Sequence, residues 1–172
     1  MDLDAFFCSV EELFEPDLHG KPFVVGGSAD GRGVVTSASY AARAYGIRSA
    51  MPTARALRLC PDLIVVRGRR GEYGKQSRRV MAVLRERAQA LQPISIDEAF
   101  LDMGSDWRLG EVTARELQAE IRDQLGLPSS WGVATNKLVA KIASEVGKPE
   151  GLVVVSPGEE ADFLADLPVR AL

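Results

Sequence analysis

The stretch that decides the fold is TARELQAEIRDQLGLPSSWGVATNKLVAKIASEV, residues 113–146. Its first part predicts an amphipathic helix, because apolar side chains recur at every fourth position. The residues of this apolar stripe are Leu117, Ile121 and Leu125. Thr113 fits an N-cap with Glu116 completing a capping box, and Gly126 fits a C-cap. The helix is therefore expected to cover residues 113–126.

Strand and helix patterns alternate on both sides of this helix. Strands are expected at residues 22–27, 31–40, 63–66, 131–135 and 152–156, with another beginning at Pro93. Helices are expected at residues 5–13, 41–46, 51–61, 72–91 and 136–146, with another after Pro157. The order in the second half, with a first strand near the N-terminus, predicts an α/β (α+β) sheet covered by helices. A ferredoxin-like sheet is one such arrangement, and the pattern alone does not single it out.

The composition is that of an ordinary soluble globular protein. Of the 172 residues, 46% are hydrophobic and 26% are charged, which suits one medium domain or two small ones sharing a core. No apolar run reaches the roughly 18 residues that a membrane helix needs. The opening MDLDAFF lacks the basic and apolar regions of a secretory signal. We therefore expect a cytoplasmic protein that does not enter the membrane.

Few residues are available for thiol or imidazole chemistry. The chain has two cysteines, Cys8 and Cys60, and one histidine, His19. A zinc site needs about four ligands at suitable spacing, which is absent. His19 lies in PDLHGKP, which is typical of a solvated loop and not of a catalytic triad. Catalysis must rest on carboxylates, lysines, hydroxyls or a hard metal ion.

Charge is distributed unevenly along the chain. The net charge of −3 argues against a free-standing nucleic-acid binder, which normally has a basic face. Residues 66–79, however, carry six basic groups against Glu72 alone. This segment is either a solvated loop and helix start or a local phosphate contact.

Two acidic motifs stand within apolar sequence. In MDLD, strand alternation would place Asp2 and Asp4 on one face, and SIDE places Asp97 beside Glu98. Clustered carboxylates repel each other unless a cation lies between them, and Mg²⁺ prefers oxygen ligands. Together the motifs supply enough carboxylate for two-metal phosphoryl or nucleotidyl transfer. The alternative is that the acids are simply solvated, at a strand edge and in a β-turn.

Three further residues are candidates for binding a triphosphate. Arg43 follows Tyr40 by three positions, so both side chains can lie on one side of a short helix. Lys148 lies in the turn GKPEG directly after a helix. Arginine and lysine are common phosphate ligands, although each of these residues could equally be a surface cation.

Four strings, in this order and spacing, resemble Y-family (translesion) DNA polymerases, and are most similar to the DinB branch. They are DLDAFFCSVEE (2–12), GVVTSASYAARAYGIRSAMP (33–52), SIDEAFLD (95–102) and GVATNKLVAKIASEVGKPEG (132–151). The resemblance extends from Asp2 to Leu172. It implies DNA-directed transfer of a dNMP from a dNTP to a primer 3′-hydroxyl, with two Mg²⁺ ions that Mn²⁺ can replace.

The resemblance also implies a role for each acid. Asp2 corresponds to the first metal-binding aspartate, and Leu3 supplies a backbone carbonyl to the second ion. Asp97 corresponds to the aspartate that bridges both ions, and Glu98 to the acid near the primer terminus. Asp4 corresponds to an acid that is not a principal ligand.

The nucleotide pocket is implied in the same way. Phe7 corresponds to the steric gate, an aromatic ring under the sugar that leaves no room for a 2′-hydroxyl, and Phe6 is its neighbour. The expected triphosphate contacts are Ser37, Tyr40, Arg43 and Lys148.

The implied domains are a discontinuous palm (1–10 and 68–155), fingers (11–67) and the start of a thumb (156–172). The family continues into a thumb and a basic little finger, which are absent here, and usually has a few residues before the first aspartate. Their absence would account for the negative charge and predicts weak affinity for primer-template DNA. We expect a monomer whose partners are primer-template DNA and dNTP, with a sliding clamp reached through the missing C-terminal region.

Two other classes of function compete with a polymerase core. One is a non-catalytic fragment or module that keeps the fold to bind a nucleotide or a partner. The other is a metal-dependent nuclease or phosphatase, which also uses clustered carboxylates. The acids Asp2, Asp97 and Glu98 favour catalysis, and the Phe6–Phe7 pair favours a deoxynucleotide pocket.

Overall fold

The computed structural model describes residues 1–169 and divides the chain into two compact units. The first contains Met1–Asp4 and the chain from Gln76 onward, and the second contains Ala5–Lys75. Across residues 1–169, none of the helices combines the length and apolar character that crossing a bilayer requires.

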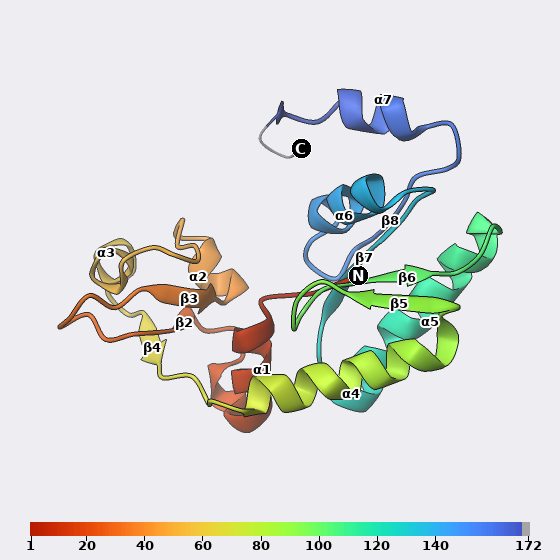
Figure 1. Cartoon of the computed structure of the whole chain (residues 1–172). Coiled ribbons are helices and arrows are strands. Elements are labelled where there is room, and N and C mark those ends of the chain that lie inside the picture. Colours follow the sequence, from red (N-terminus) through yellow and green to blue (C-terminus); the bar gives the residue numbers. More distant parts are fainter. Residues whose placement is uncertain (170–172) are drawn as a thin grey trace. The chain divides into compact units, whose positions relative to one another are not determined.

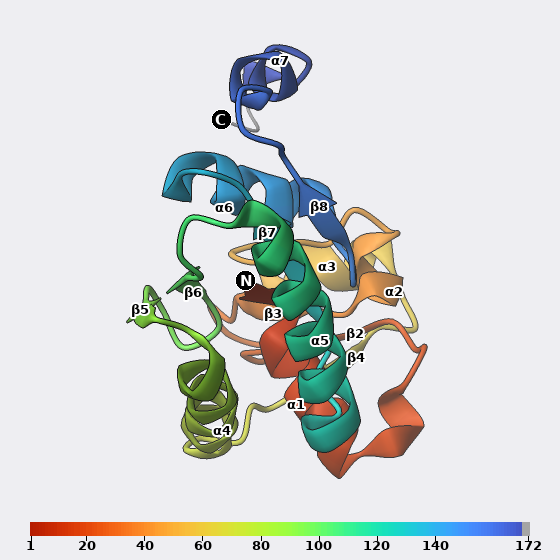
Figure 2. The same cartoon turned by 90° about the vertical axis from the view of Figure 1, so that its right-hand side faces the viewer.

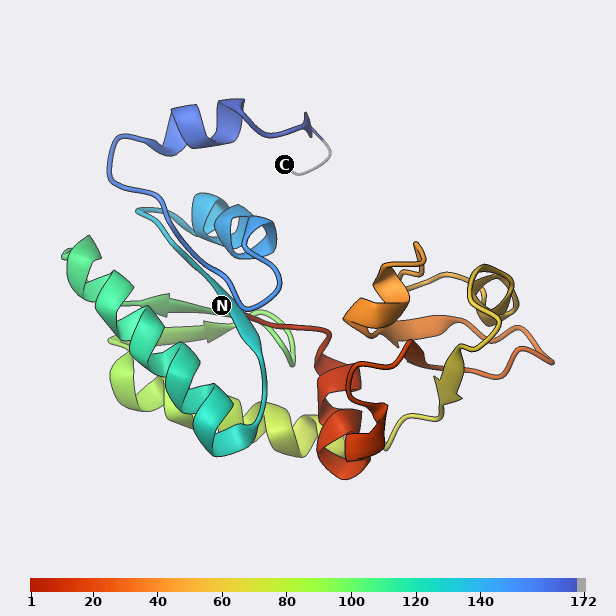
Figure 3. The same cartoon turned by 180° about the vertical axis from the view of Figure 1, so that it is seen from behind.

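The first unit is built on a sheet with strand order β1–β7–β8. Its elements are β1 (Asp2–Leu3), most of α4 (Glu72–Arg87), β5 (Ala90–Pro93), β6 (Ala99–Asp102), α5 (Trp107–Leu125), β7 (Ser129–Val133), α6 (Lys137–Val146), β8 (Leu152–Val154) and α7 (Glu160–Ala165). β1 runs antiparallel to β7, and β7 runs parallel to β8. Figures 1 and 3 show α5 and α6 flanking β7. In the turned view of Figure 2, α5 runs in front of β7.

The β5–β6 hairpin joins this sheet at β1. An antiparallel bridge pairs Asp2 with Glu98, and the Leu3 N–H donates to the Asp97 carbonyl at 2.9 Å. The Ala99 N–H donates to the Met1 carbonyl at 3.2 Å. These bonds satisfy backbone groups that would otherwise be unpaired and fix the register between the two acidic motifs. The mixed sheet covered by helices confirms the expected fold class.

The second unit has a three-stranded sheet of order β3–β2–β4. Its elements are α1 (Phe6–Phe14), the 3₁₀ turn η1 (Pro16–Leu18), β2 (Phe23–Gly26), β3 (Val35–Ala38), α2 (Tyr40–Arg43), α3 (Thr53–Leu59) and β4 (Ile64–Val66). α1 packs against β2 and β3. Apolar side chains on both sides of the sheet form the core, including Phe23, Val24, Val35 and Ile47, none of which is more than 1% exposed. Burial of these groups supplies the main stabilisation of the unit.

The region around the second acidic motif differs from expectation. The helix expected over residues 72–91 ends at Arg87, and Ala90 and Leu91 belong to β5, where they pair with β6. The strand expected to begin at Pro93 is wrong, because residues 94–98 form the turn of the hairpin. Ile94 and Ile96 are 47% and 43% exposed there, so the apolar sequence around the second acidic motif does not enclose its acids.

The start of α5 also differs. The helix begins at Trp107 and not at Thr113, because the Asp106 carboxylate caps it by accepting hydrogen bonds from the backbone N–H groups of Arg108 and Leu109. Thr113 is buried within the helix. Gly126 is the C-cap with a φ of 67°, as expected.

The two units have boundaries different from those of the expected domains. Both expected boundaries, after residues 10 and 67, fall within the second unit, and residues 156–169 group with the first unit. Three residues of the expected thumb segment, 170–172, lie outside the described residues.

Candidate active site

The two acidic motifs meet in the first unit at Asp2 and Glu98. The bridge between these residues brings their carboxyl groups within hydrogen-bonding reach of each other. Burial raises the pKa of Asp2 to about 6, and the neighbouring Glu98 contributes in the same direction. Burial also disfavours the charge on Glu98, but hydrogen bonds with Lys141 and Asp2 outweigh it and lower its pKa. As pH falls, Asp2 therefore takes up a proton before Glu98 does.

Two lysines balance this acidic pair. The Lys148 Nζ lies 2.9 Å from Asp2 Oδ1 and 2.6 Å from Glu145 Oε2. Burial disfavours the charge on Lys148, but these two carboxylates outweigh it and raise its pKa. Lys141, on α6, forms an ion pair with Glu98. Acidic and basic side chains thus lie together beside β1, with each lysine paired to a carboxylate.

Asp97 is held differently from its neighbour. Its carboxylate accepts a hydrogen bond from the Ser95 hydroxyl, and Ser95 Oγ in turn accepts the N–H groups of Asp97 and Glu98. Within residues 1–169, no group of three or more histidine, cysteine or acidic side chains is arranged to hold a metal ion. The structure therefore joins Asp2 to Glu98 but leaves Asp97 in its own turn.

Asp4 and Leu3 are both buried, Asp4 fully and Leu3 to 2% exposure. The Asp4 carboxylate accepts hydrogen bonds from the Ser130 hydroxyl, 2.9 Å from each oxygen, and from the Glu150 N–H at 2.8 Å. These partners belong to β7 and to the loop that carries Lys148. Asp4 therefore anchors that loop, whereas Asp2 binds the lysine itself.

The aromatic residues lie in the second unit. The Phe6 and Phe7 ring centroids are 5.7 Å apart, and Phe7 stacks on Tyr73 at 4.0 Å with an interplanar angle of 13°. The Phe6 side chain is buried and that of Phe7 is partly exposed. Of this pair, Phe7 is the ring that a ligand can reach.

The expected phosphate contacts of the second unit lie on β3 and α2. The Arg43 guanidinium stands over the Tyr40 ring at 4.6 Å, and its Nε donates to the Ala38 carbonyl. The Ser37 hydroxyl accepts a weak bond from the Cys8 thiol at 3.5 Å. The side chains of Tyr40 and Arg43 thus lie together, as their spacing predicts.

Sequence reasoning missed Lys141, Glu145 and Tyr73, and also Glu11, whose carboxylate accepts a hydrogen bond from the Tyr73 hydroxyl. The first two lie on α6 and the others in the second unit. One available signal was Glu11, an acid within the apolar face of a helix, because such an acid needs a partner when it is buried.

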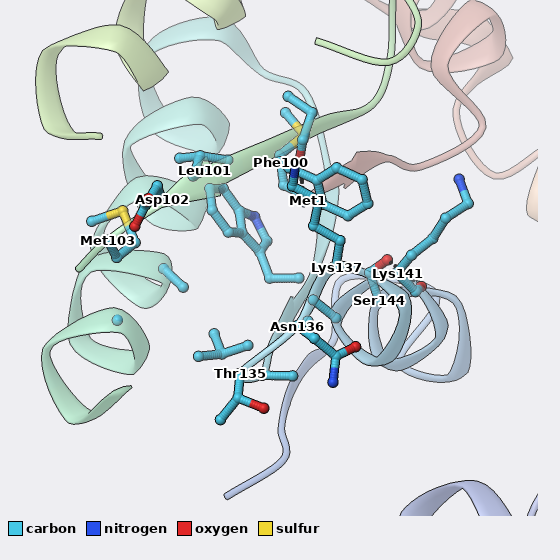
Figure 4. Close-up of a pocket in the computed structure, with 18 of the residues that line it drawn as sticks. Met1, Phe100, Leu101, Asp102, Met103, Thr135, Asn136, Lys137, Lys141 and Ser144 are labelled. Carbon is cyan, nitrogen blue, oxygen red and sulfur yellow. Dashed lines mark hydrogen bonds between the residues drawn. The ribbon is translucent and has the colours of Figure 1, made fainter. Parts of the chain in front are cut away.

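A cavity of about 540 Å³ lies beside the acidic pair, within the first unit. The hairpin, α5, β7 and α6 line it, and Glu98 and Lys141 lie at its wall. Figure 4 shows Phe100, Lys137 and Lys141 on one side of it and Asp102 and Met103 on another. Glu98 and Lys141 are therefore open to a molecule that enters from this side, whereas Asp2 is not part of the cavity wall.

Comparison with known proteins shows which family the chain is similar to. Residues 1–145 match the impB/mucB/samB family. The chain is 48% identical to DNA polymerase IV of Alkalilimnicola ehrlichii over 98% of its length and 47% identical to that of Halorhodospira halophila over 100%. It spans about half the length of these relatives, 48% and 49% respectively.

Solved structures show the same fold. DinB from Sulfolobus solfataricus superposes with a TM-score of 0.94 at 37% identity, covering 99% of this chain and 51% of that one. An insertion ternary complex of Dbh DNA polymerase superposes with a TM-score of 0.93 at 36% identity, covering 99% and 52%.

Proposed function

This chain belongs to the impB/mucB/samB family of Y-family DNA polymerases, and we propose that it carries the nucleotidyl-transfer site of a translesion DNA polymerase. The observation that carries the proposal is the contact between Asp2 and Glu98, with Lys148 and Lys141 as their partners. Residues distant in sequence form a charged site beside an open cavity. Such sites suit reactions in which charge develops on phosphate oxygens.

The acids are the proposed holders of two Mg²⁺ ions, which Mn²⁺ can replace. The donor set fits hard cations, because Asp2, Asp97, Glu98 and the Leu3 carbonyl offer only oxygen. Asp97 would exchange its hydrogen bond from Ser95 for such a contact. When bound, the ions stabilise charge on the attacking and leaving oxygens.

The protein groups bind and orient the nucleotide. Lys148 is proposed to leave Asp2 for the triphosphate, which Ser37, Tyr40 and Arg43 also contact. Phe7, with Phe6 behind it, is proposed to lie under the sugar and exclude a 2′-hydroxyl. The primer 3′-oxygen then forms a bond to the α-phosphorus of the dNTP, and the bond to the departing pyrophosphate breaks.

The whole-protein context is proposed from the relatives. We assign residues 1–10 and 68–155 to the palm, residues 11–67 to the fingers, and the chain from residue 156 onward to the start of the thumb. The proposed partners are primer-template DNA and dNTP, with a sliding clamp as a further partner. We expect a cytoplasmic monomer.

Single-nucleotide incorporation tests the proposal. The full chain at high concentration, with Mg²⁺ or Mn²⁺, is expected to extend a short primer by one nucleotide. Asp97→Ala should abolish this extension, whereas Asp123→Ala, which changes an exposed aspartate of the same unit, should leave it intact. Extension that survives in Asp97→Ala would refute the assignment.

A non-catalytic nucleotide-binding module is the second candidate. The ion pair between Lys148 and Asp2 favours it, because a cation of the protein already neutralises this acid. Binding of dNTP without any extension, in the native chain and in both variants, would support this alternative.

A further inference from the structure

The second unit contains a hydrogen-bonded network behind the Phe7 ring. Phe7 stacks on Tyr73, whose hydroxyl donates to Glu11 Oε1 at 2.6 Å. Glu11 lies one helical turn after Phe7 on α1, whereas Tyr73 lies at the start of α4. The network therefore joins two helices at the ring proposed to contact the sugar.

Glu11 is fully buried, at 0% exposure. Its Oε1 also accepts the Arg69 backbone N–H at 3.1 Å, and its Oε2 accepts Arg69 Nε at 2.9 Å. A buried carboxylate is strongly unfavourable unless such partners compensate it. Because every oxygen is engaged, Glu11 holds Arg69 and Tyr73 in one arrangement.

Two further observations show that the position of the Tyr73 hydroxyl is restricted. The Arg69 N–H donates to it as well, at 3.1 Å. A Cβ on Gly68 would stand 2.6 Å from this oxygen and 3.0 Å from Val25 Cγ1, so a side chain at Gly68 would displace it. Burial and Glu11 both raise the pKa of Tyr73, so the hydroxyl keeps the proton that it donates.

Arg69 is itself tied to α1 beyond Glu11. Its guanidinium forms an ion pair with Glu15 and lies 5.1 Å from the centroid of the Phe14 ring. Glu11 and Phe14 of α1, together with Glu15 directly after the helix, thus hold the segment that leads into Tyr73. The network therefore supports the Tyr73 side of the aromatic stack.

We propose that Glu11 and Tyr73 are positioning residues that fix the Phe7 ring and so set the discrimination between deoxyribonucleotides and ribonucleotides. This inference rests on the proposed function, in which Phe7 is the steric gate. A gate that rejects one hydroxyl group must hold its ring to within a fraction of an ångström, since small misplacements change rates strongly. A phenyl ring stacked on a braced tyrosine meets that requirement.

The test compares incorporation of dNTP and rNTP by the full chain. The measured ratio is kcat/KM for dNTP divided by kcat/KM for rNTP. Glu11→Gln and Tyr73→Phe should each lower this ratio by about tenfold or more, mainly by raising kcat/KM for rNTP. Tyr73→Phe keeps the stacked ring and removes only the hydroxyl, so it remains informative if Glu11→Gln folds poorly. Glu12→Gln, a neighbouring acid paired with His19 instead, is the matched control and should leave the ratio unchanged. Equal losses for both sugars would mean a purely structural role and would overturn the proposal.

Phe7→Ala separates this inference from the proposed function. One outcome is that Phe7→Ala lowers the ratio while neither Glu11→Gln nor Tyr73→Phe changes it. In that case the positioning role of Glu11 and Tyr73 is refuted, and the assignment of Phe7 as the steric gate is kept. If Phe7→Ala leaves the ratio unchanged, the gate assignment and this inference fail together. Should the chain incorporate nothing, the same variants are compared by the ratio of dATP to ATP dissociation constants with Mg²⁺. Binding of neither nucleotide by the native chain would refute both.

Discussion

Replacing Asp4 by alanine should destabilise the first unit strongly. Asp4 is fully buried, and its carboxylate accepts hydrogen bonds from the Ser130 hydroxyl and the Glu150 N–H. A hydrogen bond to a charged group contributes about 1.5–3 kcal/mol, and a donor left buried without a partner costs about 1–3 kcal/mol. With two donors affected, we expect Asp4→Ala to lower the free energy of unfolding by about 3–5 kcal/mol. Asp4→Asn, which keeps the shape and one acceptor, should lose about half as much.

Intrinsic fluorescence during urea unfolding measures this effect. Both tryptophans, Trp107 and Trp131, lie in the unit that contains Asp4, so their emission reports on that unit. The midpoint should fall while the dependence on urea concentration stays the same. Asp123→Ala, at an exposed position on α5, is the control and should change stability by less than about 0.5 kcal/mol.

The loop that carries Lys148 should respond as well. Weakening the bond between Asp4 and the Glu150 N–H loosens this loop, although Gln118 still holds the carbonyls of Glu150 and Gly151. The KM for dNTP should therefore rise in Asp4→Asn even where the unit remains folded. A loss in Asp4→Ala below about 1 kcal/mol would refute the reasoning, because it would mean that Ser130 and Glu150 find other partners at little cost.

Three further predictions concern stability. Gly132→Ala should prevent α6 from packing on β7, because the new Cβ would meet the Ala140 carbonyl at 2.0 Å and the Ser144 nitrogen at 2.6 Å; a variant as stable as the native chain in the same urea assay would contradict this. Asp106→Ala should lose about 1 kcal/mol through the missing N-cap of α5, and Asp106→Asn should restore most of it. Burial raises the pKa of Cys8 to about 11 from 9.0, so the folded state holds its proton more tightly than the unfolded state. Stability should therefore fall as pH rises from about 9 to about 11, and Ellman's reagent should react at pH 8 only as fast as the protein opens; rapid reaction of the native thiol would show that Cys8 is accessible.

Local patterns in the sequence were sufficient for most elements, and the errors arose where contacts with another element decided the outcome. Ala90 and Leu91 continue the apolar spacing of α4, and nothing nearby reveals that they pair with β6. The T-x-x-E pattern at Thr113 matches a capping box, yet in the structure Glu116 bonds to Arg87 of α4. Asp106, an ordinary aspartate in sequence, becomes the cap because the hairpin ends just before it.

The sequence by itself determined the helices, the strand-rich segments, the fold class and, through its motifs, the acids and aromatic residues of the candidate site. Only the tertiary structure decided which of those acids meet. Asp2 and Glu98 come into contact because β1 bridges to the hairpin turn, and Lys148 reaches Asp2 because Asp4 anchors its loop. The buried network of Glu11, Arg69 and Tyr73 likewise has no local signature. Periodicity reports which face of one element is buried, whereas contacts between elements depend on strand register and on the compensation of buried charge, which involve residues far apart in the chain.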